Sequence, residues 1–147
     1  MRHRVYGKHL SRDKNERTAL FRGLVRNLVL QESITTTQAK AKAIKGLVDK
    51  LISDSRKNTL AAKNSVISFL PQQEVSKKLM EEIAPRYKDR VSGFTTLVKL
   101  GRRQGDGTMM VKMSLVSEGE KQKTEKAESA KPEEKPKRVR KAKENVD

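Results

Sequence analysis

The spacing of apolar residues predicts a helix near the start of the chain. Between residues 11 and 31, apolar side chains recur every three or four positions, which places them on one face of an α-helix. The members of this face are Leu20, Phe21, Leu24, Val25 and Leu28. Ser11 is a fair N-cap, so the helix is expected to run from there to about Gln31. Arg22 and Arg26 fall on the opposite, polar face.

A short strand and three further helices are predicted before the last apolar runs. The β-branched segment 33–37 indicates a brief strand, and one of its threonines is expected to cap the second helix. That helix has an apolar face with the same spacing, made of Ala43, Ile44, Leu47, Val48, Leu51 and Ile52. A third helix is expected over 59–70 and a fourth over 72–83, which Pro85 breaks.

Two later segments have the pattern of a β-hairpin. Residues 93–100 and 108–116 alternate in polarity with a period of two, as strands do. They flank the glycine-rich segment GRRQGDG, which predicts an antiparallel pair with a longer loop. The predicted fold class is therefore α+β, with a small sheet and helices packed on one of its faces.

The composition changes sharply at residue 118. Of the last 30 residues, 18 are charged, ten of them basic and eight acidic, and none is aromatic. Such a segment cannot bury enough apolar surface to offset chain entropy, so 118–147 is expected to be a disordered tail. Residues 1–10 are basic and lack periodicity, which favours an extended arm. One folded domain is expected over 11–117.

The residue types present exclude several functional classes. The chain contains no cysteine, so it has no disulfide, thiolate metal site or thiol nucleophile. No apolar run approaches the roughly 18 residues of a membrane span. The two histidines, His3 and His9, lie in the arm without a core or a carboxylate to position them. We therefore expect a non-catalytic protein without metal, cofactor or small-molecule substrate.

The net charge indicates a polyanion as partner. The chain carries +16 at pH 7, of which the tail contributes only +2 and the rest +14. A compact domain with this charge repels itself unless a polyanion neutralises it. An extended basic arm favours insertion into a folded RNA, where shape and phosphate spacing matter more than base edges. Composition alone leaves open a nucleoid-type DNA-binding protein, which the lysine-rich tail also fits.

Four blocks of the sequence resemble one known family. In order they are MRHRVYGKHLSR, RTALFRGLVRNLV, SITTTQAKAKAIKGLVDKLI and GFTTLVKLGRRQGDG. In order and spacing they resemble the family of the bacterial large-subunit ribosomal protein numbered seventeen, over about residues 1–116. The resemblance implies a two-layer α/β domain of order α-β-α-α-α-β-β, without catalysis or cofactor. It also implies a place in cytoplasmic ribosomes, on large-subunit ribosomal RNA near the mouth of the nascent-chain tunnel, beside neighbouring large-subunit proteins.

Position by position, the resemblance implies a set of RNA contacts. They are Arg2, His3, Arg4, Lys8 and Arg12 of the arm, Arg17, Arg22, Arg26, Lys40 and Lys42 of the helices, and Arg102 and Arg103 of the hairpin. His9 in the arm, and Arg86 and Arg90 on the approach to the hairpin, are further candidates because of their position and charge. Two departures stand out: Thr96 replaces a common arginine, and Glu16 a frequent histidine. An RNA-modifying enzyme is the weakest alternative, since the sequence has no convergent acid, base or cofactor loop.

Overall fold

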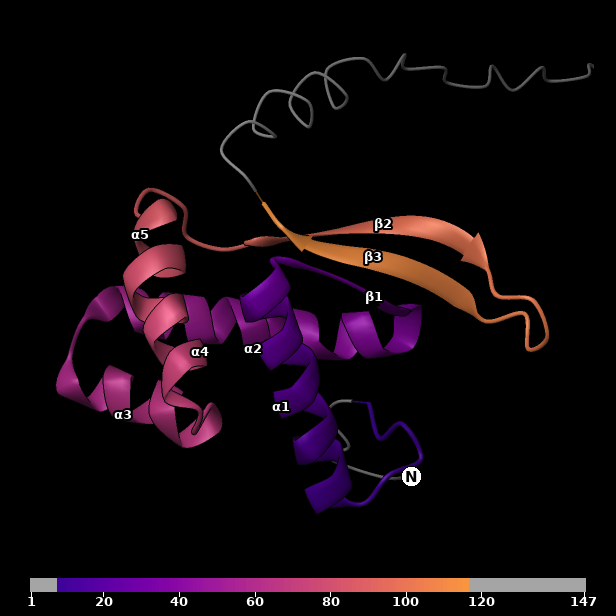
Figure 1. Ribbon diagram of the computed structural model, residues 1–147, viewed down its shortest axis with the longest axis horizontal. Helices are drawn as coiled ribbons and strands as arrows, with labels where there is room; N and C mark the ends of the chain where they lie inside the picture. Colours follow the sequence, from indigo (N-terminus) through magenta and orange to yellow (C-terminus); the bar gives the residue numbers. More distant parts are fainter. Residues whose placement is uncertain (1–7, 117–147) are drawn as a thin grey trace, which may run out of the picture. The chain divides into compact units, whose positions relative to one another are not determined.

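The helices and the sheet form two layers (Figure 1). The computed structural model describes residues 8–116, so most of the expected arm and the whole expected tail lie outside the described residues. The elements are α1 (Lys14–Gln31), β1 (Ser33–Thr37), α2 (Gln38–Lys57), α3 (Leu60–Phe69), α4 (Gln73–Lys77), η1 (Lys78–Ile83), α5 (Ala84–Arg86), β2 (Thr95–Arg102) and β3 (Met109–Leu115). The elements α4, η1 and α5 follow one another without a gap and together form one helical segment. The observed order is therefore α-β-α-α-α-β-β, which confirms the predicted order and the α+β class.

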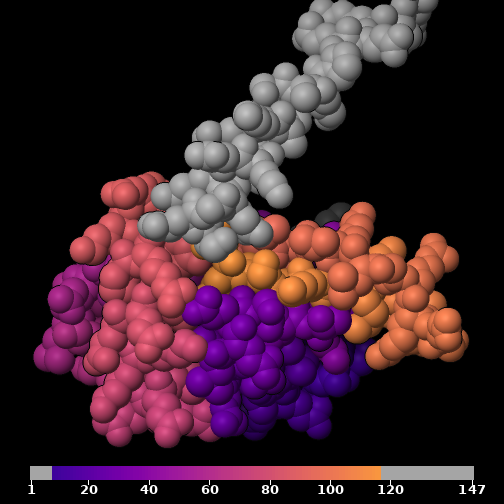
Figure 2. Space-filling view, turned by 45° about the horizontal axis from the view of Figure 1, so that its top comes forward, coloured from indigo at the N-terminus to yellow at the C-terminus, as the bar shows by residue number. Residues whose placement is uncertain are grey.

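The sheet consists of three antiparallel strands in the order β1-β3-β2. Ile34 of β1 and Leu97 of β2 both pair with Met113 of β3, so these side chains share one face. The described helices pack on this inner face and leave the other one uncovered (Figure 1). β2 bulges between Lys99 and Gly101, where the glycine has a φ of 129°. The hairpin of β2 and β3 projects from the body of the domain (Figure 2).

The core is centred where α2, the start of β2 and the end of β3 meet. Phe94 is its largest fully buried side chain, and its ring centroid lies 5.1 Å from that of Tyr87. The Tyr87 hydroxyl donates to the Val116 carbonyl at 2.7 Å, and the Val116 amide donates to the Phe94 carbonyl at 2.9 Å. Asp49 on α2 accepts a hydrogen bond from the Phe94 amide at 3.1 Å. The bond to Asp49 attaches the residue before β2 to α2, and the other two join it to Val116 and Tyr87.

Helix α1 begins later than the sequence predicted. Leu10 and Ser11 have left-handed backbone conformations, with φ of 54° and 51°, so Ser11 is not the N-cap. The Arg12 amide donates to the His9 carbonyl at 3.3 Å, which closes a turn across these residues. The extended Asp13 then precedes the first helical residue. The prediction that Ser11 caps the helix is wrong, because Ser11 belongs to a turn that precedes the helix.

The helical segment 73–86 continues through the break expected at Pro85. Its middle part, η1, is a π-helical turn, after which the Ala84 amide donates to the Leu79 carbonyl five residues earlier. Pro85 then falls within the first positions of the short turn α5, where a missing N–H leaves no helical bond unmade. The predicted break is wrong because the π turn shifts the hydrogen-bond register before the proline.

The apolar side chains of β2 are divided between its two faces. Leu97 packs against the core, whereas Val98 and Leu100 are 51% and 55% exposed. Val98 pairs with Lys112 on the outer face of the sheet. The period-two pattern therefore predicted the strand but did not identify its buried face.

The buried face of α1 predicts unequal effects of two alanine substitutions. Leu28 is fully buried, whereas Leu24 is only partly buried at the edge of the core. We expect Leu28→Ala to lower the free energy of unfolding by about 2–5 kcal/mol, because it leaves a cavity, and Leu24→Ala to lower it by clearly less. Urea unfolding followed by circular dichroism measures both values. Equal losses would contradict this orientation of the helix.

Candidate nucleic-acid interface

A cleft of about 790 Å³ lies between the first described residues, α1 and α2. Its lining consists of Lys8, His9, Arg17, Phe21, Lys42, Ala43, Gly46, Leu47 and Lys50. Most of its polar side chains are cations, and none is a carboxylate. The structure thus brings together several residues that the sequence predicted as contacts: Lys8, His9, Arg17 and Lys42.

Helical periodicity builds two walls of this cleft. Lys42, Gly46 and Lys50 are spaced by four residues on α2, so they share one side of the helix. Arg17 and Phe21 have the same spacing on α1. A Cβ atom added to Gly46 would have no neighbouring atom within 4 Å. The backbone of α2 is therefore accessible from the cleft.

Arg17 attaches the first described residues to α1. Its Nη1 lies 3.0 Å from Nδ1 of His9 and donates to the Arg12 carbonyl at 3.4 Å. Because a guanidinium can only donate, Nδ1 of His9 is the acceptor in this contact. Arg12 in turn donates to the Leu10 carbonyl at 2.8 Å. Arg17 therefore positions His9 and Arg12 as well as contributing charge.

No ion pair neutralises the cleft within residues 8–116. The ion pairs of this region join Lys57 to Asp54, Arg86 to Glu32 and Arg103 to Asp106. Like charges that converge without a counter-charge repel one another, and an anion bound among them removes that repulsion. An arginine fork together with lysine ammonium groups suits phosphates spaced along a backbone.

Arg22 and Arg26 lie outside the cleft and line a separate hollow of about 180 Å³. The Arg22 guanidinium donates to the Ser68 carbonyl at 3.2 Å and lies 5.8 Å from the centroid of the Phe69 ring. Arg22 thus connects α1 to the end of α3, while Arg26 is exposed. Lys40, near the start of α2, is half-buried and does not line the cleft.

The two candidates before the hairpin also lie elsewhere. Arg86 donates to Glu32, the C-cap residue of α1, at 2.8 Å. Arg90 is half-buried, and its carbonyl accepts a hydrogen bond from the Arg56 guanidinium. Its own Nη1 is buried without a hydrogen-bond partner among the described residues. Neither arginine belongs to the cleft.

The hairpin tip is organised around one carboxylate. Asp106 accepts from Nε of Arg103 at 3.1 Å, and Nη2 of the same guanidinium donates to its other oxygen. The amide and hydroxyl of Thr108 donate to this carboxylate at 3.2 and 2.9 Å. The bonds from Arg103, and then those from Thr108, hold the pKa of Asp106 far below its ordinary value. Arg103 is therefore engaged within the loop, whereas Arg102 is exposed.

Lys50 is a residue of the cleft that the sequence did not predict as a contact. A signal existed, because it lies eight residues after Lys42 and therefore on the same side of an amphipathic helix. Arg2, His3 and Arg4 lie outside the described residues and are not placed.

The part of the chain that the structure describes offers no membrane span and no metal site. None of its helices is long and apolar enough to cross a bilayer. Within the same residues no three His, Cys, Asp or Glu side chains gather as metal ligands.

Comparisons with known proteins agree on one family. The family model described as ribosomal protein L17 matches residues 20–116. Large ribosomal subunit protein bL17 of Thermodesulfovibrio yellowstonii is 47% identical over 106 residues, which cover 72% of this chain and 80% of that protein. The proteins of the same name from Hydrogenobaculum sp. and Dehalococcoides mccartyi are 43% and 38% identical. Each of these two matches covers 79% of this chain and 99% of the relative.

The low pKa of Asp106 predicts that the hydrogen bonds of the hairpin tip persist at acidic pH. A carboxylate with a depressed folded-state pKa keeps its bonds while the pH falls through the ordinary aspartate range near 3.9, and loses them only at lower pH. We therefore expect the NMR shift of the Thr108 amide to stay constant down to about pH 3. In Asp106→Asn the same amide should shift already at neutral pH. A wild-type transition centred near 3.9 would contradict the bidentate pair.

Proposed function

Because the chain belongs to the ribosomal protein L17 family, we propose that it binds large-subunit ribosomal RNA near the mouth of the nascent-chain tunnel. Membership of this family makes it a structural component of the large ribosomal subunit, in the ribosomes of the cytoplasm, and not an enzyme. The observation that carries the proposal is the cleft between Lys8 and His9, α1 and α2, which gathers cations without a counter-charge among residues 8–116.

In the proposed complex the cleft holds a stretch of sugar-phosphate backbone. Its lysines supply compact charges, and Arg17 supplies a planar fork for phosphate oxygens. Phe21 and Leu47 form an apolar part of the lining, against which a ribose or base face packs. The open side of Gly46 admits the RNA backbone close to α2. Such contacts position an RNA without reading its sequence.

The remaining predicted contacts differ in how free they are to bind. Arg26 and Arg102 are exposed, and so is Arg12, whose bond to the Leu10 carbonyl stays within its own turn; we include these three in the interface together with Arg2, His3, Arg4 and Lys40. Arg22, Arg86 and Arg103 have partners within the domain, so we assign them weaker contributions. Arg90, which is half-buried, belongs to this second group.

Two alternatives open at the level of composition receive no support from the comparisons. A nucleoid protein rests on charge and on the lysine-rich tail alone, and an RNA-modifying enzyme rests on no identified acid, base or cofactor loop. The relatives are named as proteins of the large ribosomal subunit, which supports RNA as the polyanion. Neighbouring large-subunit proteins are the second class of partner that we propose.

The cleft predicts a change in the salt dependence of RNA binding. Removing one phosphate-binding cation should reduce the slope of log affinity against log salt concentration by about 0.7–0.9. We expect Lys50→Gln to weaken binding of the full chain to large-subunit ribosomal RNA and to lower this slope by about that amount. Filter binding over a salt series measures both quantities.

Lys77→Gln is the matched control for this experiment. Lys77 is an exposed lysine on α4 that does not line the cleft. The substitution removes the same charge, so it should leave the slope nearly unchanged. Equal effects of the two variants would contradict the cleft as the contact surface.

The proposed location can be tested because the chain has no cysteine of its own. Gln104→Cys places a single thiol at the exposed hairpin tip, and Asn64→Cys places one on the exposed side of α3. Tethered iron-EDTA on either thiol cleaves nearby ribosomal RNA in reconstituted large subunits. We expect cleavage from Gln104→Cys around the tunnel mouth, and a different set of sites from Asn64→Cys. Cleavage by both variants only at the face that meets the small subunit would overturn the location.

A further inference from the structure

A second concave site lies at the other end of α2 from the cleft. This pocket has a volume of about 430 Å³, within the range of roughly 300–1,000 Å³ typical of small-ligand sites. Its lining consists of Ser55, Arg56, Asn58, Lys63, Met80, Ala84, Pro85 and Lys88. The residues come from the end of α2, from α3 and from the segment of η1 and α5 with the turn that follows. None of them was predicted as a contact from the sequence.

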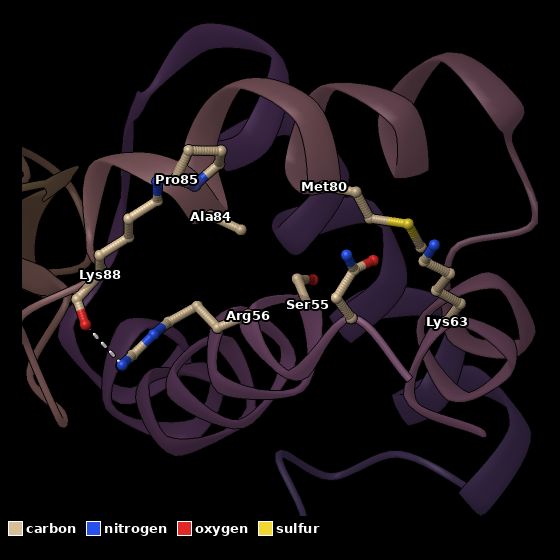
Figure 3. A pocket seen from close by; sticks show the side chains of 8 residues that line it. Ser55, Arg56, Lys63, Met80, Ala84, Pro85 and Lys88 are labelled. Atoms are coloured by element: carbon tan, nitrogen blue, oxygen red, sulfur yellow. Dashed lines mark hydrogen bonds between the residues drawn. The ribbon is translucent and has the colours of Figure 1, made fainter. Parts of the chain in front are cut away.

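The pocket has a polar wall and an apolar wall. Figure 3 shows Ser55 and Arg56 along one side, and Met80, Ala84 and Pro85 along the opposite side. The same view shows Lys63 and Lys88 at opposite ends of the hollow. The pocket therefore has an apolar side in its middle and a cation at each end.

The polar wall is held rigidly by hydrogen bonds. The Arg56 guanidinium donates to the Lys88 carbonyl at 2.7 Å and to the Arg90 carbonyl. The Ser55 hydroxyl donates to the Leu51 carbonyl at 2.8 Å. A side chain fixed in this way loses little further conformational freedom when a ligand binds. Asn58 adds an amide, which can both donate and accept.

The apolar wall is formed at the π-helical turn. Met80 belongs to η1, and Ala84 is the residue that directly follows it. π-helical turns are rare and occur frequently at functional sites. Here the turn coincides with the lining of a pocket. This coincidence is independent of the charges around it.

Charge determines the class of ligand. Lys63, Lys88 and Arg56 line the pocket without any carboxylate, and no ion pair in residues 8–116 involves them. A ligand that suits this lining has a flat, uncharged middle and an anionic group on each side. A nucleotide inside an RNA strand has this form, because a phosphate lies on either side of its base and sugar. Free phosphate lacks the flat part, and a nucleoside monophosphate has only one of the two anions.

We propose that this pocket binds one unstacked nucleotide of a single-stranded RNA segment, with its base against Met80, Ala84 and Pro85 and its flanking phosphates at Lys63 and Lys88. Single-stranded RNA is commonly recognised through bases turned out of the stack and bound by protein side chains. A base within a duplex is stacked on both sides and cannot enter. The proposal rests on RNA binding as the function, and adds a site at which the RNA is single-stranded.

The test uses the full chain with methionine methyl groups labelled with carbon-13, observed by NMR. Met80 reports on the pocket, and the fully buried Met113 reports on the core. The probes are a uridine trinucleotide, uridine monophosphate and inorganic phosphate. We expect the trinucleotide to shift the Met80 methyl in a saturable manner and to leave Met113 unchanged. Uridine monophosphate should bind about tenfold more weakly, since one charge-assisted contact is missing, and phosphate alone should leave Met80 unshifted.

Two variants locate the phosphates, and one variant serves as control. Lys63→Gln and Lys88→Gln change exposed side chains, so the fold should persist, and each should weaken trinucleotide binding about tenfold. Lys77→Gln should have no effect on the Met80 shift. An unmoved Met80, equal shifts with all three probes, or equal behaviour of the three lysine variants would overturn the proposal.

A cleft variant separates this inference from the proposed function. Lys50→Gln should lower the affinity for large-subunit ribosomal RNA while leaving the trinucleotide shift of Met80 intact. Failure of the wild-type chain to bind ribosomal RNA would overturn the proposed function. Binding of ribosomal RNA with an unmoved Met80 would overturn only the nucleotide pocket.

Discussion

The burial of one face of α2 is the constraint on which most of the structure depends. Ile44, Val48 and Ile52 are buried on this face, and α2 contacts all three strands as well as α1, α3, η1 and α5. Because a helix has a fixed period, burying these side chains also fixes the direction of every other residue on it. Lys42 and Lys50 are thereby directed to the cleft at one end, and Ser55 and Arg56 to the pocket at the other. The hydrogen bond from the Phe94 amide to Asp49 attaches the sheet to the middle of the same helix.

The basic side chains of the domain divide into two groups with different physical roles. One group donates to backbone carbonyls at the ends of helices and in turns: Lys78 to Leu30, Arg22 to Ser68, and Arg56 to Lys88 and Arg90. Lys78 and Arg22 satisfy carbonyls in the last turns of α1 and α3 and interact favourably with the dipoles of these helices, whereas Arg56 binds carbonyls of the turn that follows α5. The other group, in the cleft and at the ends of the pocket, has no ion-pair partner among the described residues. A high net charge is therefore compatible with a stable fold, because some of the cations donate hydrogen bonds to backbone carbonyls within the domain.

Local physics explains which features could be predicted from the sequence. The strand at Ser33–Thr37 and the helices α2 and α3 follow from residue periodicity and from the proline after α3, which operate within a few residues. The expected capping of α2 by a threonine side chain is wrong, because Thr37 precedes the helix without a side-chain cap bond. The pairing of Arg86 with Glu32 joins residues 54 positions apart, so it could not be read from a helix pattern. The left-handed turn at Leu10 and the π turn before Pro85 are conformations that no simple residue pattern indicates. By contrast, the bond between Arg103 and Asp106 is local, and their spacing across a glycine-rich loop was a usable signal.

The rigidity of α2 has a consequence for how an RNA strand would engage both proposed sites. Gly46 in the cleft and Ser55 in the pocket are nine residues apart, which corresponds to about 14 Å along a helix axis. Nine residues are also about two and a half turns, so the two positions face opposite sides of α2. A strand bound in the cleft brings its next single-stranded segment to the pocket at a high effective concentration only if it is long enough to pass around the helix. The cleft and the pocket can then each bind weakly, because an RNA strand bound at both sites is held more tightly than at either one. A change that bends α2, without touching any cation, should uncouple the two sites by altering only their spacing.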